Sequence, residues 1–123
     1  MSHILLIGLG GALGAIARHA VGQITVDQLG SSIVGTLITN ISGTFLLGLL
    51  VGLLSSHSAW PAEIRIFLTV GFLASYTTFS TLSVATVQLI EKGQITSAAV
   101  NLGVSILLGL TAAVGGMVLG RSI

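Results

Sequence analysis

Long apolar stretches separated by short polar segments set the organisation of this chain. Four stretches carry no Lys, Arg, Asp or Glu: residues 1–17, 28–62, 66–90 and 93–120. A helix needs roughly 20 mostly apolar residues to cross a bilayer. The pattern therefore predicts four transmembrane helices, near residues 3–22, 31–54, 66–90 and 95–119.

The connections between these spans are short and polar. Trp60 and Pro61 follow the second span, where an interfacial aromatic residue and a helix breaker are expected. Glu91-Lys92-Gly93 is typical of a polar hairpin with a glycine at which the helix stops. Since the loops are only a few residues long, neighbouring spans are expected to run antiparallel. The prediction is an all-α integral membrane protein, with one four-helix domain over residues 1–123.

The composition supports a membrane protein and excludes several functions. Of 123 residues, 53% are hydrophobic and only 6% are charged, whereas a soluble domain is about 25% charged. A net charge of +1 without basic clusters argues against nucleic-acid binding. The chain has no Cys, which excludes disulfides and thiol catalysis. The acidic and histidine residues all lie near span ends without nucleophile–base or metal-ligand spacing, so no enzyme activity is expected.

The basic residues give no preferred orientation in the membrane. With four spans, Arg65 and Arg121 lie on one side, and Arg18 and Lys92 lie on the other. The positive-inside rule therefore has no excess on which to act. Either another feature sets the orientation, or the chain inserts both ways and pairs with an inverted copy of itself.

Polar residues inside the spans suggest a path for a small anion. Asn40, in the second span, either forms hydrogen bonds that join neighbouring helices or is an amide donor that faces a pore. Asn101 and Ser105 share one face of the fourth span and could continue a polar track from Asn40. None of these groups ionises, so the track offers hydrogen bonds without a proton carrier.

The third span is unusually rich in hydroxyl groups. Six of the nine residues from 75 to 83 are Ser or Thr. They form either an ordinary packing seam or the support for a break in the helix at mid-membrane. A break frees carbonyl oxygens, which are suitable ligands for a hard cation such as Na⁺. Glycine pairs four residues apart, such as Gly10 and Gly14, are interpreted as sites of close helix packing.

Several of these segments together resemble the Fluc (CrcB) fluoride channels, over the whole chain. The segments are Gly10-Gly11-Ala12-Leu13-Gly14-Ala15-Ile16-Ala17-Arg18, Gly35-Thr36-Leu37-Ile38-Thr39-Asn40-Ile41-Ser42-Gly43, Gly71-Phe72, Thr77-Thr78-Phe79-Ser80-Thr81, and Ser105 with Gly109. The threonine–phenylalanine string is the most specific of them. The resemblance implies a fluoride-selective, passive ion channel in the cell inner membrane that exports fluoride from the cytoplasm and lowers its toxicity.

The resemblance also implies an assembly and its sites. Family members are dual-topology antiparallel dimers with two narrow pores and a structural Na⁺ on the dimer axis. The Na⁺ would be held by the backbone carbonyls of Ala74 and Thr77 at a break in the third helix. The pore residues would be Asn40, Thr78, Phe79, Leu82 and Ser105. The aromatic edge of Phe79 is electropositive and can face an anion.

Three departures from the family pattern bear on the pore. Leu82 stands where a second Phe is usual, Ala74 stands where Gly is usual, and Ala85 stands where many members have Glu. The chain could therefore form a homodimer that conducts weakly, or it could be one subunit of a heterodimer with a paralogous chain. A different class, the small multidrug-resistance exporters, needs an acid in the first span, and residues 1–26 contain none. A non-transporting assembly subunit is the remaining alternative.

Overall fold

The computed structural model describes residues 2–57 and 59–123, and its regular elements there are all helices. Its elements in chain order are α1 (His3–Leu29), α2 (Ser32–Ser56), α3 (Ala62–Ile66), η1 (Phe67–Leu73), α4 (Ala74–Tyr76), α5 (Phe79–Glu91) and α6 (Ile95–Ser122). Four helical spans in this part of the chain are long and apolar enough to cross a membrane, the third of them running from α3 to α5. The predicted number of spans is confirmed.

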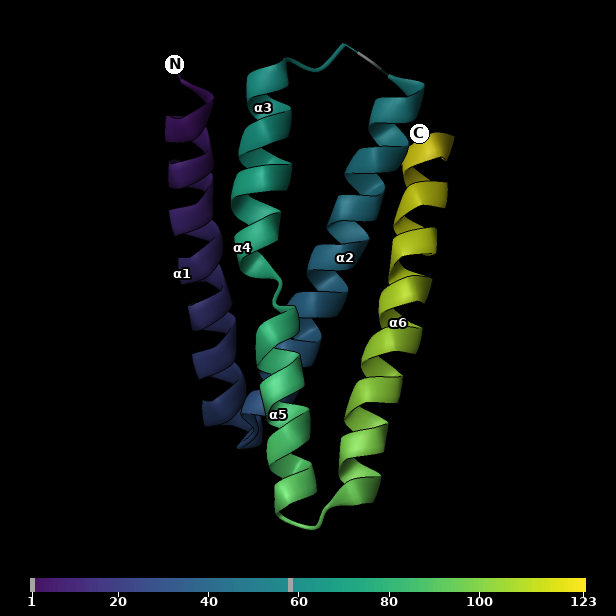
Figure 1. The fold of residues 1–123 in the computed structure, drawn as a ribbon. Coiled ribbons are helices and arrows are strands. Elements are labelled where there is room, and N and C mark those ends of the chain that lie inside the picture. Colours follow the sequence, from purple (N-terminus) through teal and green to yellow (C-terminus); the bar gives the residue numbers. More distant parts are fainter. Residues whose placement is uncertain (1, 58) are drawn as a thin grey trace.

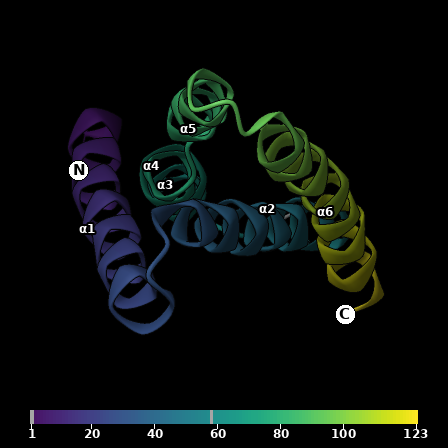
Figure 2. The ribbon, with the colours of Figure 1, turned by 90° about the horizontal axis from the view of Figure 1, so that it is seen from below.

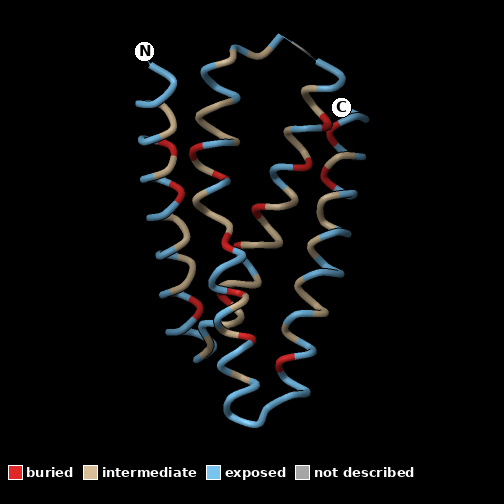
Figure 3. The backbone as a smooth tube through the Cα atoms, viewed as in Figure 1, coloured by how far each residue is buried: buried red, intermediate tan, exposed pale blue. Residues whose placement is uncertain are grey.

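Neighbouring spans are antiparallel, as the short loops predicted. Both termini and the α2–α3 connection lie at one end, and the α1–α2 and α5–α6 connections lie at the other (Figure 1). Viewed along the spans, α2 forms a base with α1 and α6 at its two ends, and the α3–α5 span stands between them (Figure 2). Buried residues are few and lie along the inner faces (Figure 3). Most apolar side chains are thus left for lipid or for another chain.

The first helix is longer than the predicted span. It continues to Leu29 rather than ending near residue 22, and Gly30 caps it with φ of 69°. The predicted span describes a membrane segment, and a helix can leave the bilayer without unwinding. Its end is set by the glycine, which adopts the left-handed conformation at no steric cost.

The α5–α6 hairpin closes as the sequence predicted. Gly93 has φ of 75°. Its N–H donates to the Ile90 carbonyl at 2.9 Å, and the Gln94 N–H donates to the Leu89 carbonyl at 2.8 Å. These two bonds satisfy carbonyls that the helix end would leave unpaired.

Glycines let the helices approach at backbone distance. A Cβ on Gly10 or Gly14 would collide with the backbone of η1, at Phe67 and Phe72. The other two pairs lie against each other across α2 and α6: Gly48 with Gly52, and Gly116 with Gly120. The interpretation of these pairs as packing sites is therefore confirmed.

Candidate functional site

Two residues with extended backbone separate α4 from α5. Thr77 has φ −91° and ψ 157°, and Thr78 has φ −154° and ψ 112°. The threonine hydroxyls secure both flanking ends. Thr77 Oγ1 donates to the Leu73 carbonyl at 3.0 Å, and Thr78 Oγ1 accepts from the Thr81 N–H at 3.2 Å as the N-cap of α5.

The side chain of Asn40 pairs with the backbone of this extended segment. Asn40 Oδ1 accepts from the Thr78 N–H at 2.7 Å, and Asn40 Nδ2 donates to the Thr78 carbonyl at 3.1 Å. Both backbone groups of a residue outside the helices are thus satisfied by one amide. Because the amide carries two N–H bonds, the second one is left to serve another acceptor. Asn40 therefore ties the extended segment to α2, and it can also be a donor.

The carbonyls of Ala74 and Thr77 lose the donors that a continuous helix would give them. The N–H four residues after Ala74 belongs to Thr78, and it donates to Asn40. The N–H four residues after Thr77 belongs to Thr81, and it donates to the Thr78 hydroxyl. Side chains thus divert both donors, and two carbonyl oxygens near mid-span are left to accept from elsewhere.

A groove of about 400 Å³ brings the five predicted pore residues together. It lies between α2, the extended segment and α6, and it also exposes Thr77. The lining residues are Asn40, Thr44, Thr77, Thr78, Phe79, Leu82, Leu102, Ser105, Ile106, Gly109, Leu110 and Ala113. The groove combines an apolar wall with a few hydroxyl and amide groups, which is the usual composition of a small-ligand site. Ala74 is outside it.

The two residues at the predicted aromatic positions lie in contrasting environments. Phe79 is 78% exposed, whereas Leu82 is 7% exposed. Both line the groove, but other residues of the chain cover Leu82, whereas Phe79 projects outward. In a membrane span such an outward-facing ring is left for lipid or for another chain, as are most apolar side chains here.

Ser105 carries a buried hydroxyl without a partner. Within the described residues, its Oγ is the buried side-chain polar atom that forms no hydrogen bond. Leaving such a group unsatisfied costs about 1–3 kcal/mol. Ser105 also lines the groove that contains Asn40 and Phe79, so an acceptor that reached its hydroxyl would remove this cost.

The predicted track from Asn40 through Ser105 to Asn101 is not a single groove. Asn101 Nδ2 donates to Thr86 Oγ1 at 3.2 Å, and Thr86 Oγ1 in turn donates to the Leu82 carbonyl at 2.8 Å. Asn101 lines a separate cavity of about 460 Å³ beside the α5–α6 hairpin. Residues four apart share a helix face only approximately, and the tilt of α6 away from α2 separates the two.

Sequence reasoning did not single out a second groove that reaches the extended segment. It has a volume of about 300 Å³ and contains Arg18 and Gln23 of α1, Thr36 of α2, and Thr78 and Thr81. Thr78 lines both grooves. The available signal was Arg18 itself, a charged residue inside the predicted first span near residues 3–22.

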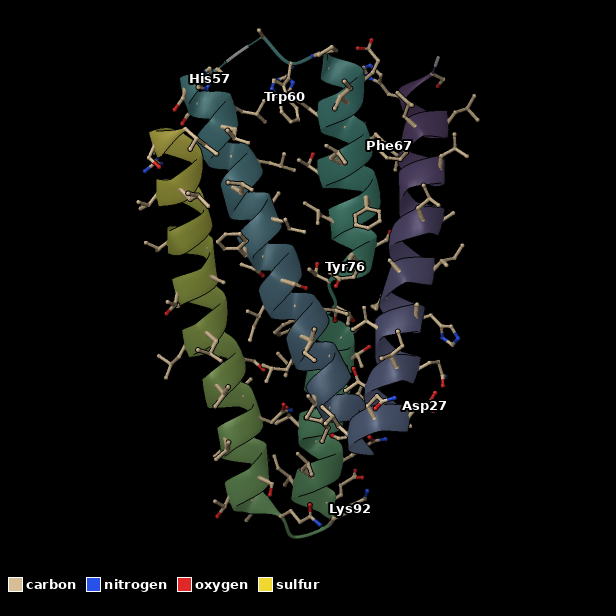
Figure 4. The ribbon with its side chains drawn as sticks, turned by 180° about the vertical axis from the view of Figure 1, so that it is seen from behind. Asp27, His57, Trp60, Phe67, Tyr76 and Lys92 are labelled. Atoms are coloured by element: carbon tan, nitrogen blue, oxygen red, sulfur yellow. The ribbon has the colours of Figure 1, made fainter. Side chains whose placement is uncertain are left out.

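Four further polar or aromatic residues lie near the ends of the spans. Asp27 and Lys92 mark one end, and His57 and Trp60 mark the other (Figure 4). No group of three His, Cys, Asp or Glu side chains that could hold a metal ion occurs within residues 2–57 and 59–123. A cation bound near mid-span would therefore depend on backbone or hydroxyl oxygens.

Comparison with known proteins identifies the family. Residues 5–117 match the model of the CrcB-like protein family, Camphor Resistance (CrcB). The chain belongs to the CrcB-like family. It is 38% identical to a fluoride-specific ion channel FluC of Rhizobium meliloti over 99% of this chain and 98% of the relative. It is also 41% identical to the FluC protein of Nitrobacter winogradskyi over 98% and 96%.

A third CrcB-family relative agrees with these two. The fluoride-specific ion channel FluC of Hydrogenovibrio crunogenus is 43% identical over 89% of this chain and 83% of the relative. The family expected from the glycine-rich, asparagine and threonine–phenylalanine segments is thus confirmed, and the similarity extends through all four spans.

Proposed function

We propose that this CrcB-family protein is a passive, fluoride-selective channel and not an enzyme. The observation that carries the proposal is the convergence of unpaired donors in one groove. The Ser105 hydroxyl has no partner among the described residues, and the Asn40 amide retains one N–H. Fluoride is a small, strong hydrogen-bond acceptor. The relatives, each named a fluoride-specific ion channel, support this assignment.

Passive export is sufficient to protect a cell. In acidic surroundings fluoride enters as neutral HF, dissociates at the higher internal pH and is trapped. The anion then leaves down its own gradient and down the negative-inside potential, so no coupled proton is needed. The groove around Asn40 and Ser105 contains no ionisable side chain. This composition disfavours a proton-coupled multidrug exporter. The proposed location is therefore the cell inner membrane, across which such export would run.

The two grooves at Thr78 form the proposed route. Arg18 attracts fluoride into the groove of about 300 Å³, because a cation in a narrow cleft raises the local anion concentration. Thr78 lines both grooves, and the positive N-terminal end of α5 begins at the next residue. The anion then passes Asn40, the ring edge of Phe79 and Ser105.

The active assembly in this proposal is an antiparallel dual-topology dimer. Phe79 projects from its own subunit, and a second copy covers it and completes each of two pores. The balance of Arg65 and Arg121 against Arg18 and Lys92 allows both orientations to insert. A paralogous chain with Phe at the position of Leu82 is the second candidate partner, because Leu82 offers no electropositive edge.

A structural Na⁺ at the break in the third span completes the proposal. The residues fit such an ion, since the Ala74 and Thr77 carbonyls have lost their helical donors to Asn40 and Thr78. Carbonyl oxygens are suitable ligands for a hard cation. The fixed positive charge would hold the break in place between two subunits. Ala74 takes part through its backbone, so a side chain in place of hydrogen is compatible with this role.

Fluoride efflux from liposomes that contain only this purified chain tests the function. The vesicles are loaded with fluoride, valinomycin sets the potential, and an electrode follows external fluoride. Rapid efflux without a pH gradient, together with exclusion of chloride, is expected. Efflux that requires a proton gradient, or equal passage of chloride, would contradict the proposal. Efflux that appears only after a paralogous chain is added would support the heterodimer instead.

Cysteine labelling tests the dual topology, because the chain contains no native Cys. Ser122→Cys marks the end with the termini, and Gln94→Cys marks the α5–α6 hairpin at the opposite end. An impermeant maleimide added outside intact cells should modify about half of each variant if both orientations insert. Complete labelling of one variant and none of the other would mean a single orientation.

A further inference from the structure

We infer that Tyr76 is a positioning residue for the cation site, and that it acts through a hydrogen bond to Ser42. Tyr76 is the last residue of α4, and it lies between the two residues whose carbonyls would bind the cation, Ala74 and Thr77. The inference rests on the proposed sodium site and deepens it. The contact between Tyr76 and Ser42 fixes the turn that carries the Ala74 and Thr77 carbonyls.

The direction of this hydrogen bond follows from the contacts of Ser42. The Tyr76 hydroxyl oxygen and Ser42 Oγ lie 3.0 Å apart. Ser42 has one hydroxyl hydrogen, and its shortest contact is the Ile38 carbonyl at 2.6 Å. Ser42 Oγ therefore donates to Ile38 and accepts from Tyr76. The result is a chain of two bonds that links the end of α4 to the backbone of α2.

Two further contacts hold the Tyr76 ring. Its ring stacks on Phe72, one turn earlier, with centroids 5.8 Å apart and planes inclined by 16°. On the α2 side, a Cβ on Gly43 would lie 3.0 Å from Tyr76 Cδ1 and would collide with Thr77 Cγ2. Glycine is needed here because the α2 backbone passes directly against residues 76 and 77.

The position of Tyr76 makes this bond more important than an ordinary surface contact. After Tyr76 the backbone is extended, so α4 has no following turn to brace its last residues. Asn40 holds the far side of the extended segment, at Thr78. The Ser42–Tyr76 bond holds the near side. Asn40 and Ser42, from one turn of α2, thus hold the residues on both sides of Thr77. A Thr77 carbonyl that is already fixed in position loses less entropy when it binds a cation.

Sodium-dependent thermal unfolding of the full-length purified chain tests the inference. Choline chloride replaces sodium chloride to keep the ionic strength constant. Tyr76→Phe removes the donor, and Ser42→Ala removes the acceptor. Each should raise the sodium concentration at half-maximal stabilisation by about five- to tenfold, the factor expected for one hydrogen bond. The double variant should shift no further than either single variant, because both remove the same bond.

Two controls separate this role from general destabilisation. Ser42→Thr keeps an oxygen acceptor and should restore the sodium dependence of the unaltered chain. Thr111→Val removes a hydroxyl that donates to the Leu107 carbonyl on the exposed side of α6, and it should have no effect. Unchanged sodium dependence in both Tyr76→Phe and Ser42→Ala, or additive shifts in the double variant, would overturn the inference while leaving the sodium site standing. An unaltered chain that shows no sodium dependence would instead overturn the sodium site.

Discussion

The side-chain amide of Asn40 forms two hydrogen bonds with the backbone of Thr78, one to its N–H and one to its carbonyl. This pairing replaces the partners that a continuous helix would have supplied. It makes Asn40 both a structural support of the extended segment and a neighbour of the proposed anion path.

Asn40→Asp should separate these two contributions. The carboxylate still accepts from the Thr78 N–H, but it cannot donate, and it carries a negative charge. Two like charges 4 Å apart repel by about 4 kcal/mol at an effective dielectric constant of 20. Fluoride efflux from liposomes should therefore fall at least about a hundredfold at neutral pH. Normal conduction by a correctly assembled Asn40→Asp protein would exclude a pore role. Asn40→Ser is the uncharged comparison, and it should retain more flux.

Ser105→Ala should change stability and flux in opposite directions. Removing a buried hydroxyl that has no partner among the described residues relieves a cost of about 1–3 kcal/mol, so the unfolding temperature should stay constant or rise. The same change removes a donor from the groove, and efflux should fall several-fold. Thermal unfolding and efflux measured on one preparation check both effects. A fall in stability with unchanged efflux would mean that Ser105 has only a packing role.

Phe79→Ala should affect conduction more than subunit folding. The ring is 78% exposed within the subunit, so its removal costs the isolated fold little. Efflux and dimer formation should both decline, as measured by the electrode assay and by size-exclusion chromatography in detergent. Phe72→Ala is the matched comparison. It removes the ring that stacks on Tyr76, so its loss should lower the unfolding temperature instead.

Leu82→Phe should raise the fluoride efflux of the pure homodimer several-fold by supplying the second aromatic edge. The gain is limited because Leu82 is only 7% exposed, and a larger side chain there costs about 1–3 kcal/mol in overpacking. Efflux and unfolding temperature should be measured together. Fast efflux from the unaltered chain that Leu82→Phe does not change would show that the second aromatic ring is dispensable.

Arg18→Gln should weaken the entrance without closing the pore. Loss of the guanidinium charge lowers the local fluoride concentration, so the concentration at half-maximal flux should rise several-fold while the maximal flux changes little. The dependence on ionic strength should also diminish. Arg121→Gln, in the exposed last turn of α6, should leave both quantities unchanged. Equal effects of the two substitutions would indicate a general surface-charge effect.

The sequence predicted the spans and the hairpin because both depend on local chemistry. Uncharged stretches identify membrane segments, and Gly93 ends α5 by its own backbone preference. The helix α1 continues past the predicted span because leaving the bilayer and leaving the helix are different events. The bonds from Asn40 to Thr78 could not be predicted, because the two residues are 38 positions apart in the sequence. The burial of Leu82 could not be predicted either, because it depends on packing against another helix.

The π-helical segment η1 sets the direction in which the residues beyond it in the third span face. Its wide turn, in which the Ala74 N–H reaches back to the Thr69 carbonyl, accommodates one residue more than an α-helical turn would. If the same seven residues wound as an ordinary α-helix, everything beyond them would rotate by about 100°, and the Tyr76 hydroxyl would point away from Ser42. Deleting one residue between Phe67 and Leu73 should instead allow an α-helix with residues 74–78 still facing α2. The direction in which residues 74–78 face thus depends on the number of residues in η1 and on how they wind. No side-chain substitution farther along the span could restore that direction once it was lost.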